Sequence, residues 1–233
     1  MYHIQTGTDT YGRVKAVAGT AIVTKFFMFQ SLPVFPLRSY YFIRHGETTR
    51  SGVPFFASEE TTSIVGLPLA SIDVASALMA YVRAGFATMT VVGSIAMVPG
   101  IIYLTGEHLD DFAMTATKGL LASLTTGIVG GLLTYAIPLI SHRERDIRAY
   151  CAELLGVSAD PARVTPEAQK MIGDYIDDPQ LMTDHPRTRQ IRQLIATRLE
   201  LANSENARAF EDRTDNLLER LRADEQAGGR AEA

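Results

Sequence analysis

The sequence predicts a membrane protein of α+β class, in which a two-helix transmembrane hairpin separates a small N-terminal antiparallel β module from a C-terminal cytoplasmic α-helical domain. Three observations lead to this fold class. Two stretches of more than 20 residues lack any charge, the segment before them is rich in β-branched and aromatic residues, and the segment after them has helical spacing of apolar residues. The expected boundaries are 1–70 for the β module, 71–141 for the hairpin, 142–223 for the helical domain and 224–233 for a disordered tail.

The composition excludes several function classes. With 22 Lys+Arg against 26 Asp+Glu the net charge is −4, which excludes a strongly basic nucleic-acid binder, and a hydrophobic content of 46% excludes a fully disordered chain. The single cysteine, Cys151, excludes a disulfide framework and any zinc site built on several cysteines. Neither the histidines nor the glycines form a recognisable ligand or phosphate motif, so we expect no cofactor and no metal.

The β module is predicted from residues 13–43, where residues 21–29 and 39–43 resemble strands separated by a proline turn. We expect three or four antiparallel strands. The aromatic side chains of this region have two interpretations, as the core of the module or as groups that dock it to the bilayer interface. They are Phe26, Phe27, Phe29, Phe35, Tyr40, Tyr41 and Phe42.

The hairpin is predicted by the two uncharged stretches, residues 84–104 and 119–140. At about 1.5 Å per residue each helix would be about 30 Å long, which matches the hydrocarbon thickness of a bilayer. Residues 105–118 between them form a short acidic loop. The alternative interpretation is a pair of buried helices in a soluble bundle.

Small residues recur every four positions in the second stretch and, over a shorter length, in the first. They are Gly119, Ser123, Gly127 and Gly131, with Ala96 and Gly100 in the first stretch. On a helix these residues form one stripe, which allows another helix to approach closely. The partner is either the other helix of the hairpin or a second copy of the chain, and the sequence leaves both open.

Basic residues are more numerous near the two outer membrane ends than at the loop end between the predicted helices. Arg83, Arg143, Arg145 and Arg148 stand against Lys118 alone at the loop end. By the positive-inside rule both termini are expected in the cytoplasm. The segment MYHIQTGTDTYGR has no basic head followed by an apolar run, so the first span would act as its own insertion signal. The expected location is a bacterial inner membrane, with a two-pass topology.

The C-terminal region carries several helix signals. Ile147, Cys151, Leu154 and Leu155 share a face of a helix that ends at Gly156, and Thr165-Pro166 begins a second helix that extends to residue 176. Residues 191–199 and 210–221 have amphipathic spacing, with a break at Asn203-Ser204. These two segments form either an intramolecular helical hairpin or a short coiled coil with a partner.

Two short segments resemble known families. FFMFQSLPVFPLRSYYF (26–42) resembles an aromatic β segment of small bacterial membrane-associated proteins that contain zinc ribbons, but the cysteines of those proteins are missing here. Phe42–Thr48 resembles the Arg-His-Gly signature of the histidine phosphatase superfamily. That resemblance implies His45 as phosphoryl acceptor, Arg44 as phosphate ligand and a doubly wound fold, with His142 as the only candidate for the second histidine of the family. On the residues alone, Arg44-His45-Gly46 is a polar turn after a strand.

The leading functional prediction is non-catalytic: a scaffold, an adaptor or a subunit of a membrane assembly. Its partners would be the lipid bilayer and either a homo-oligomer or another membrane protein, with no nucleic acid. No ionisable residue lies within either predicted span, which argues against an ion pathway through this hairpin alone. The alternatives are a membrane-tethered phosphatase that uses Arg44 and His45, and an oligomeric pore.

Overall fold

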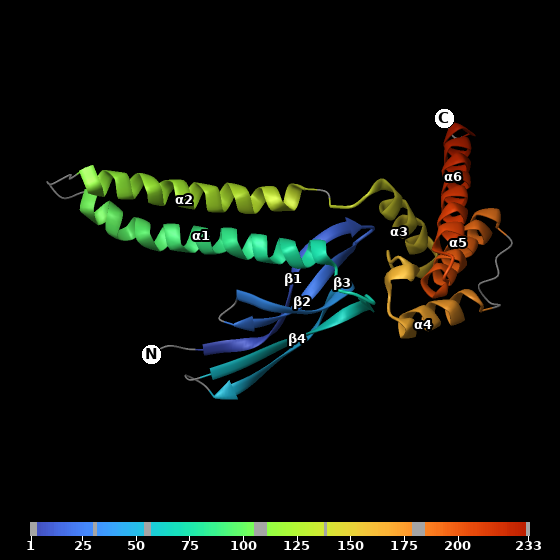
Figure 1. Ribbon diagram of the computed structural model, residues 1–233, viewed down its shortest axis with the longest axis horizontal. Coiled ribbons are helices and arrows are strands. Elements are labelled where there is room, and N and C mark those ends of the chain that lie inside the picture. The colour runs from blue at the N-terminus through green and yellow to red at the C-terminus, as the bar shows by residue number, and fades with distance from the viewer. Residues whose placement is uncertain are drawn as a thin grey trace.

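The fold is α+β, with a β-barrel, a long helical hairpin and a bundle of shorter helices in order along the chain (Figure 1). The structure is a computed structural model that describes residues 4–29, 32–53, 57–104, 111–137, 139–178 and 185–231. Side chains are described for residues 8–29, 32–43, 65–95, 118–137, 139–178 and 185–227. The predicted α+β class, with two helices apolar enough to span a membrane, is confirmed.

The barrel has four strands, β1 (Ile4–Val17), β2 (Thr20–Phe29), β3 (Leu32–Val53) and β4 (Ala57–Pro68). Successive strands pair antiparallel, and β4 closes the barrel by pairing in parallel with the first residues of β1. Ala18 and Gly19 join β1 to β2 with φ of 43° and 79°, the positive values typical of a two-residue hairpin turn. The predicted antiparallel order therefore holds for three pairings, and the parallel closure was not predicted.

Strand structure extends further along the chain than the sequence predicted. We expected a turn at Arg44-His45-Gly46, yet β3 continues through this segment to Val53. Its pairing with β4 shifts register between Phe42 and Arg44 and again between His45 and Thr48. The segment is polar and lacks a clear apolar alternation, so the period-two signal of a half-buried strand is weak there.

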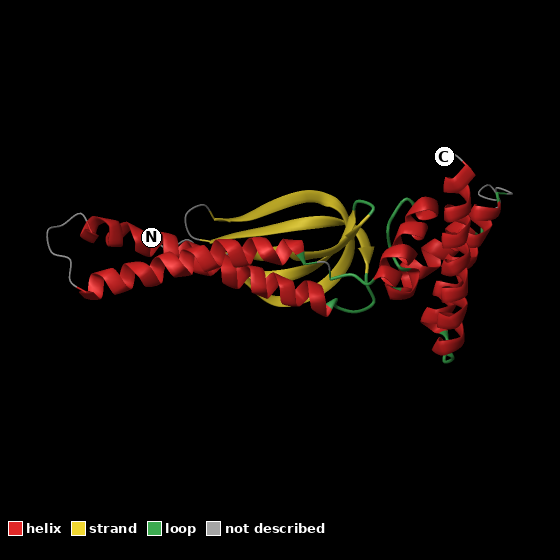
Figure 2. Cartoon of the chain, turned by 90° about the horizontal axis from the view of Figure 1, so that it is seen from above, coloured by secondary structure: helices red, strands yellow, loops and turns green. Residues whose placement is uncertain are grey.

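The hairpin consists of α1 (Val74–Leu104) and α2 (Asp111–Ala136), and it extends beyond the barrel on one side (Figures 1 and 2). Residues 74–95 and 118–136 are long and apolar enough to cross a membrane, with mean hydropathies of 1.3 and 1.4. Only 17% and 11% of the most apolar window of each is buried inside the protein. Core helices of a soluble bundle would be mostly buried, and within this chain these two helices are mostly exposed.

The hairpin differs from the prediction at two helix ends. The second span was expected to reach Ile140, but α2 ends at Ala136, and Leu139 and Ile140 are not helical. Pro138 itself lies outside the described residues; a proline disfavours helical conformation in the residue before it. The predicted loop 105–118 is too long because α2 begins at Asp111, and residues 105–110 lie outside the described part of the chain.

The C-terminal bundle is built from five short elements. They are α3 (His142–Leu155), η1 (Pro161–Arg163), α4 (Pro166–Ile176), α5 (Pro186–Asn203) and α6 (Ala207–Ala231). As predicted, Gly156 ends α3 with φ of 69°, and Thr165-Pro166 begins α4. The break between α5 and α6 also falls where it was predicted, at Ser204.

The apolar face of α6 packs within its own chain. Leu217, Leu218 and Leu221 are buried in the same core as residues of α3 and α5. This favours the intramolecular hairpin over a coiled coil with a partner for these residues. The backbone of α6 continues to Ala231, whereas a disordered tail was expected from residue 224.

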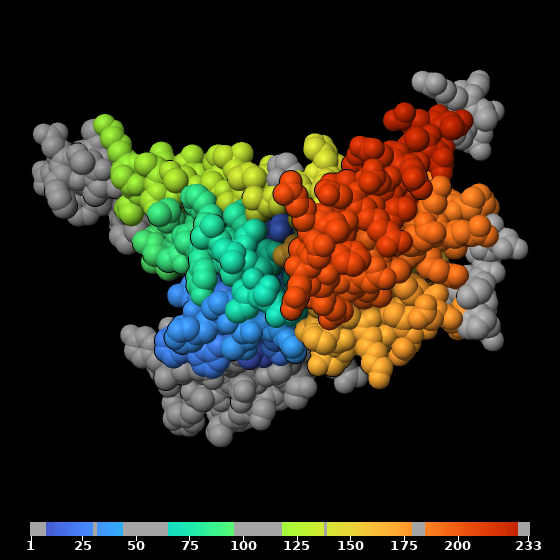
Figure 3. Space-filling view, turned by 45° about the vertical axis from the view of Figure 1, so that its right-hand side comes forward, coloured from blue at the N-terminus to red at the C-terminus, as the bar shows by residue number. Residues whose placement is uncertain are grey.

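One hydrophobic core runs from the barrel into the bundle. Val14, Ile22 and Tyr41 of the barrel belong to the same buried cluster as Ile147 of α3 and Leu194 of α5. The space-filling view shows the barrel and the bundle in direct contact (Figure 3). The barrel and the helical bundle thus share a core, although the hairpin separates them in the sequence.

Candidate functional site

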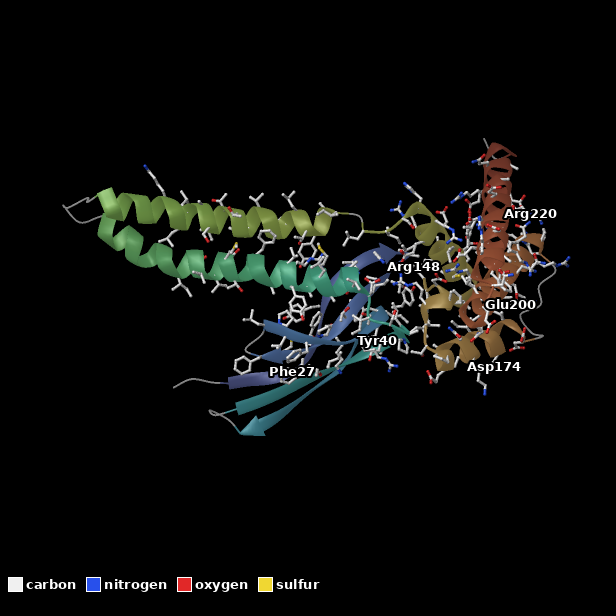
Figure 4. The ribbon with its side chains drawn as sticks, in the orientation of Figure 1. Phe27, Tyr40, Arg148, Asp174, Glu200 and Arg220 are labelled. Atoms are coloured by element: carbon white, nitrogen blue, oxygen red, sulfur yellow. The ribbon has the colours of Figure 1, made fainter. Side chains whose placement is uncertain are left out.

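The candidate site is the junction at the base of the hairpin, where β1, the start of α1, α3 and η1 meet. We define the junction by its five charged residues, Lys15, Asp73, Glu144, Arg148 and Arg163. They come from β1, the start of α1, η1 and α3, which supplies both Glu144 and Arg148, and Arg148 reaches from α3 to the end of the barrel (Figure 4). The junction is therefore where all three parts of the fold are joined.

Asp73 occupies the start of α1. Its Oδ1 accepts a hydrogen bond from the Ser76 backbone N–H at 2.8 Å, so it caps the helix. Its Oδ2 lies 3.0 Å from Lys15 Nζ and 2.7 Å from an Arg163 nitrogen. Burial disfavours the charged carboxylate, but the hydrogen bonds from Ser76, Arg163 and Lys15 outweigh it and hold the pKa of Asp73 below its ordinary value.

Glu144 of α3 completes this ion-pair network. Its side chain lies 2.9 Å from Arg163 Nη1 and 3.6 Å from Lys15 Nζ. Two cations and two carboxylates from β1, α1, η1 and α3 thus balance one another in a largely buried position. Removal of any one of them would leave an uncompensated charge in the junction.

Arg148 is the largest fully buried side chain in the described part of the chain. It donates hydrogen bonds to the carbonyl oxygens of Ser158 at 3.1 Å, Lys15 at 2.5 Å and Thr20 at 3.0 Å. Its guanidinium also lies 5.0 Å from the centre of the Tyr41 ring. Burial lowers the pKa of this guanidinium, which remains charged because arginine is so basic. Arg148 thereby fixes the bundle to the β1–β2 turn.

A buried chain of hydroxyl groups connects the barrel to the start of α1. Thr24 and Ser39 are hydrogen-bonded at 2.8 Å, and Thr24 donates to Ser76 at 3.0 Å. Ser76 in turn donates to the Gly12 carbonyl at 2.8 Å. A side chain at Gly12 would place its Cβ 1.9 Å from the Ser76 carbonyl oxygen, and Gly12 has φ of 72°, so only glycine allows β1 to lie this close to α1.

Arg83 joins both helices of the hairpin to the barrel. Its guanidinium donates to the carbonyl oxygens of Arg13 at 2.8 Å and Thr134 at 3.0 Å, and to the Thr134 hydroxyl at 3.2 Å. It also lies 3.9 Å from the centre of the Tyr135 ring. These contacts hold the last turn of α2 beside α1 at the level where the uncharged stretch of α1 begins.

Only part of the small-residue stripe of α2 lies against α1 among the described residues. At Gly127 a Cβ would lie 2.4 Å from Thr90 Oγ1, and at Gly131 it would lie 3.7 Å from Phe86 Cβ. At Gly119 no atom of the described residues lies within 4 Å, and Ser123 is half-buried. Ala96 and Gly100 belong to α1, but their side-chain positions lie outside the described residues.

Two further glycines take part in the helix contact and were missed by the sequence analysis. A Cβ at Gly93 would lie 3.0 Å from the Leu124 backbone nitrogen, and one at Gly130 would lie 2.3 Å from the Phe86 ring. Neither falls on the four-residue repeat of the stripe. The contact between α1 and α2 is therefore broader than a single row of residues.

The residues that carry the phosphatase resemblance lie on two different elements, Arg44 and His45 on β3 and His142 on α3. Arg44 and His45 pair with Val65 and Ile64 in the β3–β4 ladder, and their side chains lie outside the described residues. His142 is the first residue of α3 and is exposed. The described part of the chain has a four-stranded barrel in place of the doubly wound sheet that the resemblance implies.

Among the described residues, the titratable groups outside the junction do not form a reactive site. Burial raises the pKa of the Cys151 thiol, which keeps it protonated and unreactive. Within the described ranges, no three His, Cys, Asp or Glu side chains are arranged to hold a metal ion. Asp160 and Arg198 form a buried ion pair at 2.6 Å that holds α5 against the start of η1.

Comparison with protein-family models, with curated protein sequences and with solved structures gave no match.

Proposed function

We propose that the chain is an integral membrane protein with a non-catalytic role, as a scaffold, adaptor or subunit of a membrane assembly. The hairpin would cross the bilayer, and the barrel and the helical bundle would lie together on its cytoplasmic side. The apolar, outward-facing surface of α1 and α2 supports the membrane placement, since Ile95, Leu132 and Leu133 are each more than half exposed.

The observation that carries the scaffold proposal is the Arg148 contact. Because Arg148 of α3 donates to the carbonyls of Lys15 and Thr20, the bundle and the barrel meet at the base of the hairpin. Two modules held in a fixed orientation beside a membrane anchor are suited to position other proteins. A catalytic role would require a cluster of reactive groups, and the described residues offer structural ion pairs in its place.

The orientation is supported by the distribution of charge. Arg143 and Arg145 follow the second span, and Arg83 precedes the uncharged stretch of the first, while Glu107 and Asp110 lie in the connection between the helices. Cytoplasmic flanks of membrane helices are enriched in arginine and lysine. The contact between the two modules requires that both occupy the same side.

Membrane fractionation with an alkaline carbonate wash tests the placement. We expect the chain to stay in the washed membranes. Its appearance in the soluble fraction would contradict the proposal.

The scaffold role is tested by comparing the size of the complex extracted in mild detergent for the native chain, Arg148→Met and the matched variant Arg220→Met. Arg220 is an exposed arginine of α6. We expect the native chain and Arg220→Met to form a complex larger than one copy, which Arg148→Met reduces. Phosphomonoester hydrolysis that His45→Ala abolishes would instead establish the phosphatase.

A further inference from the structure

A basic cavity lies at the base of the hairpin, where α2 leaves the apolar stretch. It has a volume of about 300 Å³ and is lined by β1, by Arg83 of α1 and by six residues around the connection from α2 to α3, namely Tyr135, Ala136, Ile137, Leu139, Ile140 and Arg145. Four of its lining residues are cationic: Arg13, Lys15, Arg83 and Arg145. None of the lining residues is acidic.

Three of these four cations have no carboxylate partner in the described part of the chain. Lys15 is balanced by Asp73 and Glu144. Arg83 donates only to neutral oxygens. The guanidinium groups of Arg13 and Arg145 are exposed and make no hydrogen bond or ion pair with other described residues. The cavity therefore carries uncompensated positive charge that an anion would neutralise.

An apolar groove adjoins this cavity. The groove has a volume of about 500 Å³, shares Arg13, Arg83 and Tyr135 with the basic cavity, and runs between the barrel and α1. Its other lining residues are mostly apolar and include Val23, Leu32, Phe42, Ala84 and Ala87. A basic end joined to an apolar groove matches a ligand with an anionic head and a hydrocarbon chain.

The groove lies at the depth expected for the bilayer interface. Tyr81, one turn before the uncharged stretch of α1, donates a hydrogen bond to the Val34 carbonyl at 2.8 Å. Beside Val34, the β2–β3 end of the barrel exposes Phe29 and Phe35, at 46% and 63%. Exposed aromatic side chains are favoured at the boundary between water and hydrocarbon. Phe27, a further exposed aromatic of this end, is labelled in Figure 4.

We propose that the basic cavity binds the phosphate headgroup of an anionic phospholipid from the surrounding bilayer, with the adjoining groove holding the start of an acyl chain. This inference rests on the proposed membrane placement. The arginines would neutralise the phosphate, and the exposed aromatic end of the barrel would keep the groove at the interface. The bound lipid would then contact all three parts of the fold.

Thermal unfolding of the purified full chain in an uncharged detergent tests this proposal. Short-chain phosphatidylglycerol is expected to raise Tm by about 3–6 °C at tenfold excess over its Kd. Phosphatidylcholine and inorganic phosphate at the same concentration should each have a much smaller effect. Arg13→Gln and Arg145→Gln should each weaken the apparent affinity about fivefold, and the double variant about 25-fold.

The variants are chosen to leave the fold intact. Arg13 and Arg145 have no side-chain partner among the described residues, and Arg220→Gln on α6, away from the hairpin, serves as the matched control that should respond as the native chain does (Figure 4). An equal response to phosphatidylcholine, or an unchanged response of the double variant, would overturn the proposal. If inorganic phosphate raised Tm as much as phosphatidylglycerol does, the ligand would be a free anion and the lipid proposal would be wrong. Carbonate extraction tests the membrane placement separately, so failure of the lipid proposal can be distinguished from failure of the proposed membrane placement.

Discussion

Replacement of Gly127 by alanine is expected to weaken the packing of α1 against α2. The added Cβ would lie 2.4 Å from Thr90 Oγ1, 2.8 Å from the Thr90 backbone nitrogen and 3.0 Å from the Phe86 carbonyl oxygen. Two of these three atoms belong to the backbone of α1, and the hydroxyl is held by its own hydrogen bond to Phe86 at 2.9 Å. A change of rotamer cannot relieve the clash, so the helices must separate.

The magnitude follows from two opposing effects. Overpacking of this kind costs about 1–3 kcal/mol, whereas alanine is a better helix former than glycine by up to about 1 kcal/mol. Gly119→Ala provides the matched control, since no atom of the described residues lies within 4 Å of its added Cβ and the helix-forming gain is the effect that remains. The two variants should therefore differ in unfolding free energy by about 1–3 kcal/mol, or about 2–12 °C in Tm.

Thermal unfolding of both variants in the same detergent measures this difference. Gly131→Ala should fall close to Gly119→Ala, because its Cβ would make an ordinary contact of 3.7 Å with Phe86. Equal Tm values for Gly127→Ala and Gly119→Ala would refute the packing argument. Loss of a higher oligomer on Gly119→Ala alone would assign the outer end of the stripe to contact between copies.

The remaining predictions concern the junction and the barrel. Asp73→Asn keeps the helix cap but removes the charge, and it should lower the unfolding free energy by about 2–3 kcal/mol. This is less than the loss of a fully buried ion pair, because the Arg163 side chain is 31% exposed. Asp73→Ala also removes the cap and should lower the unfolding free energy by about 1 kcal/mol more. Because the folded state holds the pKa of Asp73 below its unfolded value of about 3.9, its contribution is fully present above that value and is lost as pH falls through the folded pKa. An acid titration of Tm should thus be shallower for Asp73→Asn than for the native chain, and equal slopes would argue against this ion pair. Phe26→Ala, at a fully buried position, should cost about 3–5 kcal/mol, whereas Phe35→Ala, at a position 63% exposed, should change denaturant stability by about 0.5 kcal/mol or less.

The parts of the fold with local signals could be predicted from the sequence. The absence of charge over 84–104 indicated a helix, and α1 covers all of these residues. The cap residues Gly156 and Thr165 placed the end of α3 and the start of α4 correctly. These features depend on neighbours within one or two helical turns, or on composition alone. The four-residue spacing likewise indicated a helix contact at Gly127, but it gave equal weight to Gly119, which has no neighbour within 4 Å.

The junction could not be predicted because its contacts join distant residues and use backbone acceptors. Arg148 was counted as a membrane-flanking charge, yet it is fully buried and donates to the Lys15 carbonyl 133 positions earlier. A carbonyl oxygen has no sequence signature, since every residue carries one. Likewise, nothing near Asp73 in the sequence indicates Lys15 or Arg163 as its partners.

The Arg148 contact also imposes an order on biogenesis. The Thr20 residue is synthesised 128 residues before the arginine that binds its carbonyl, and both helices of the hairpin are synthesised in that interval. Until then the end of the barrel carries polar groups whose native donors have not been synthesised, at a site that becomes water-excluded only when the bundle docks. Chains truncated before α3 and released would therefore be able to insert the hairpin yet remain incomplete, and a quality-control protease could distinguish them from finished molecules by this uncovered end.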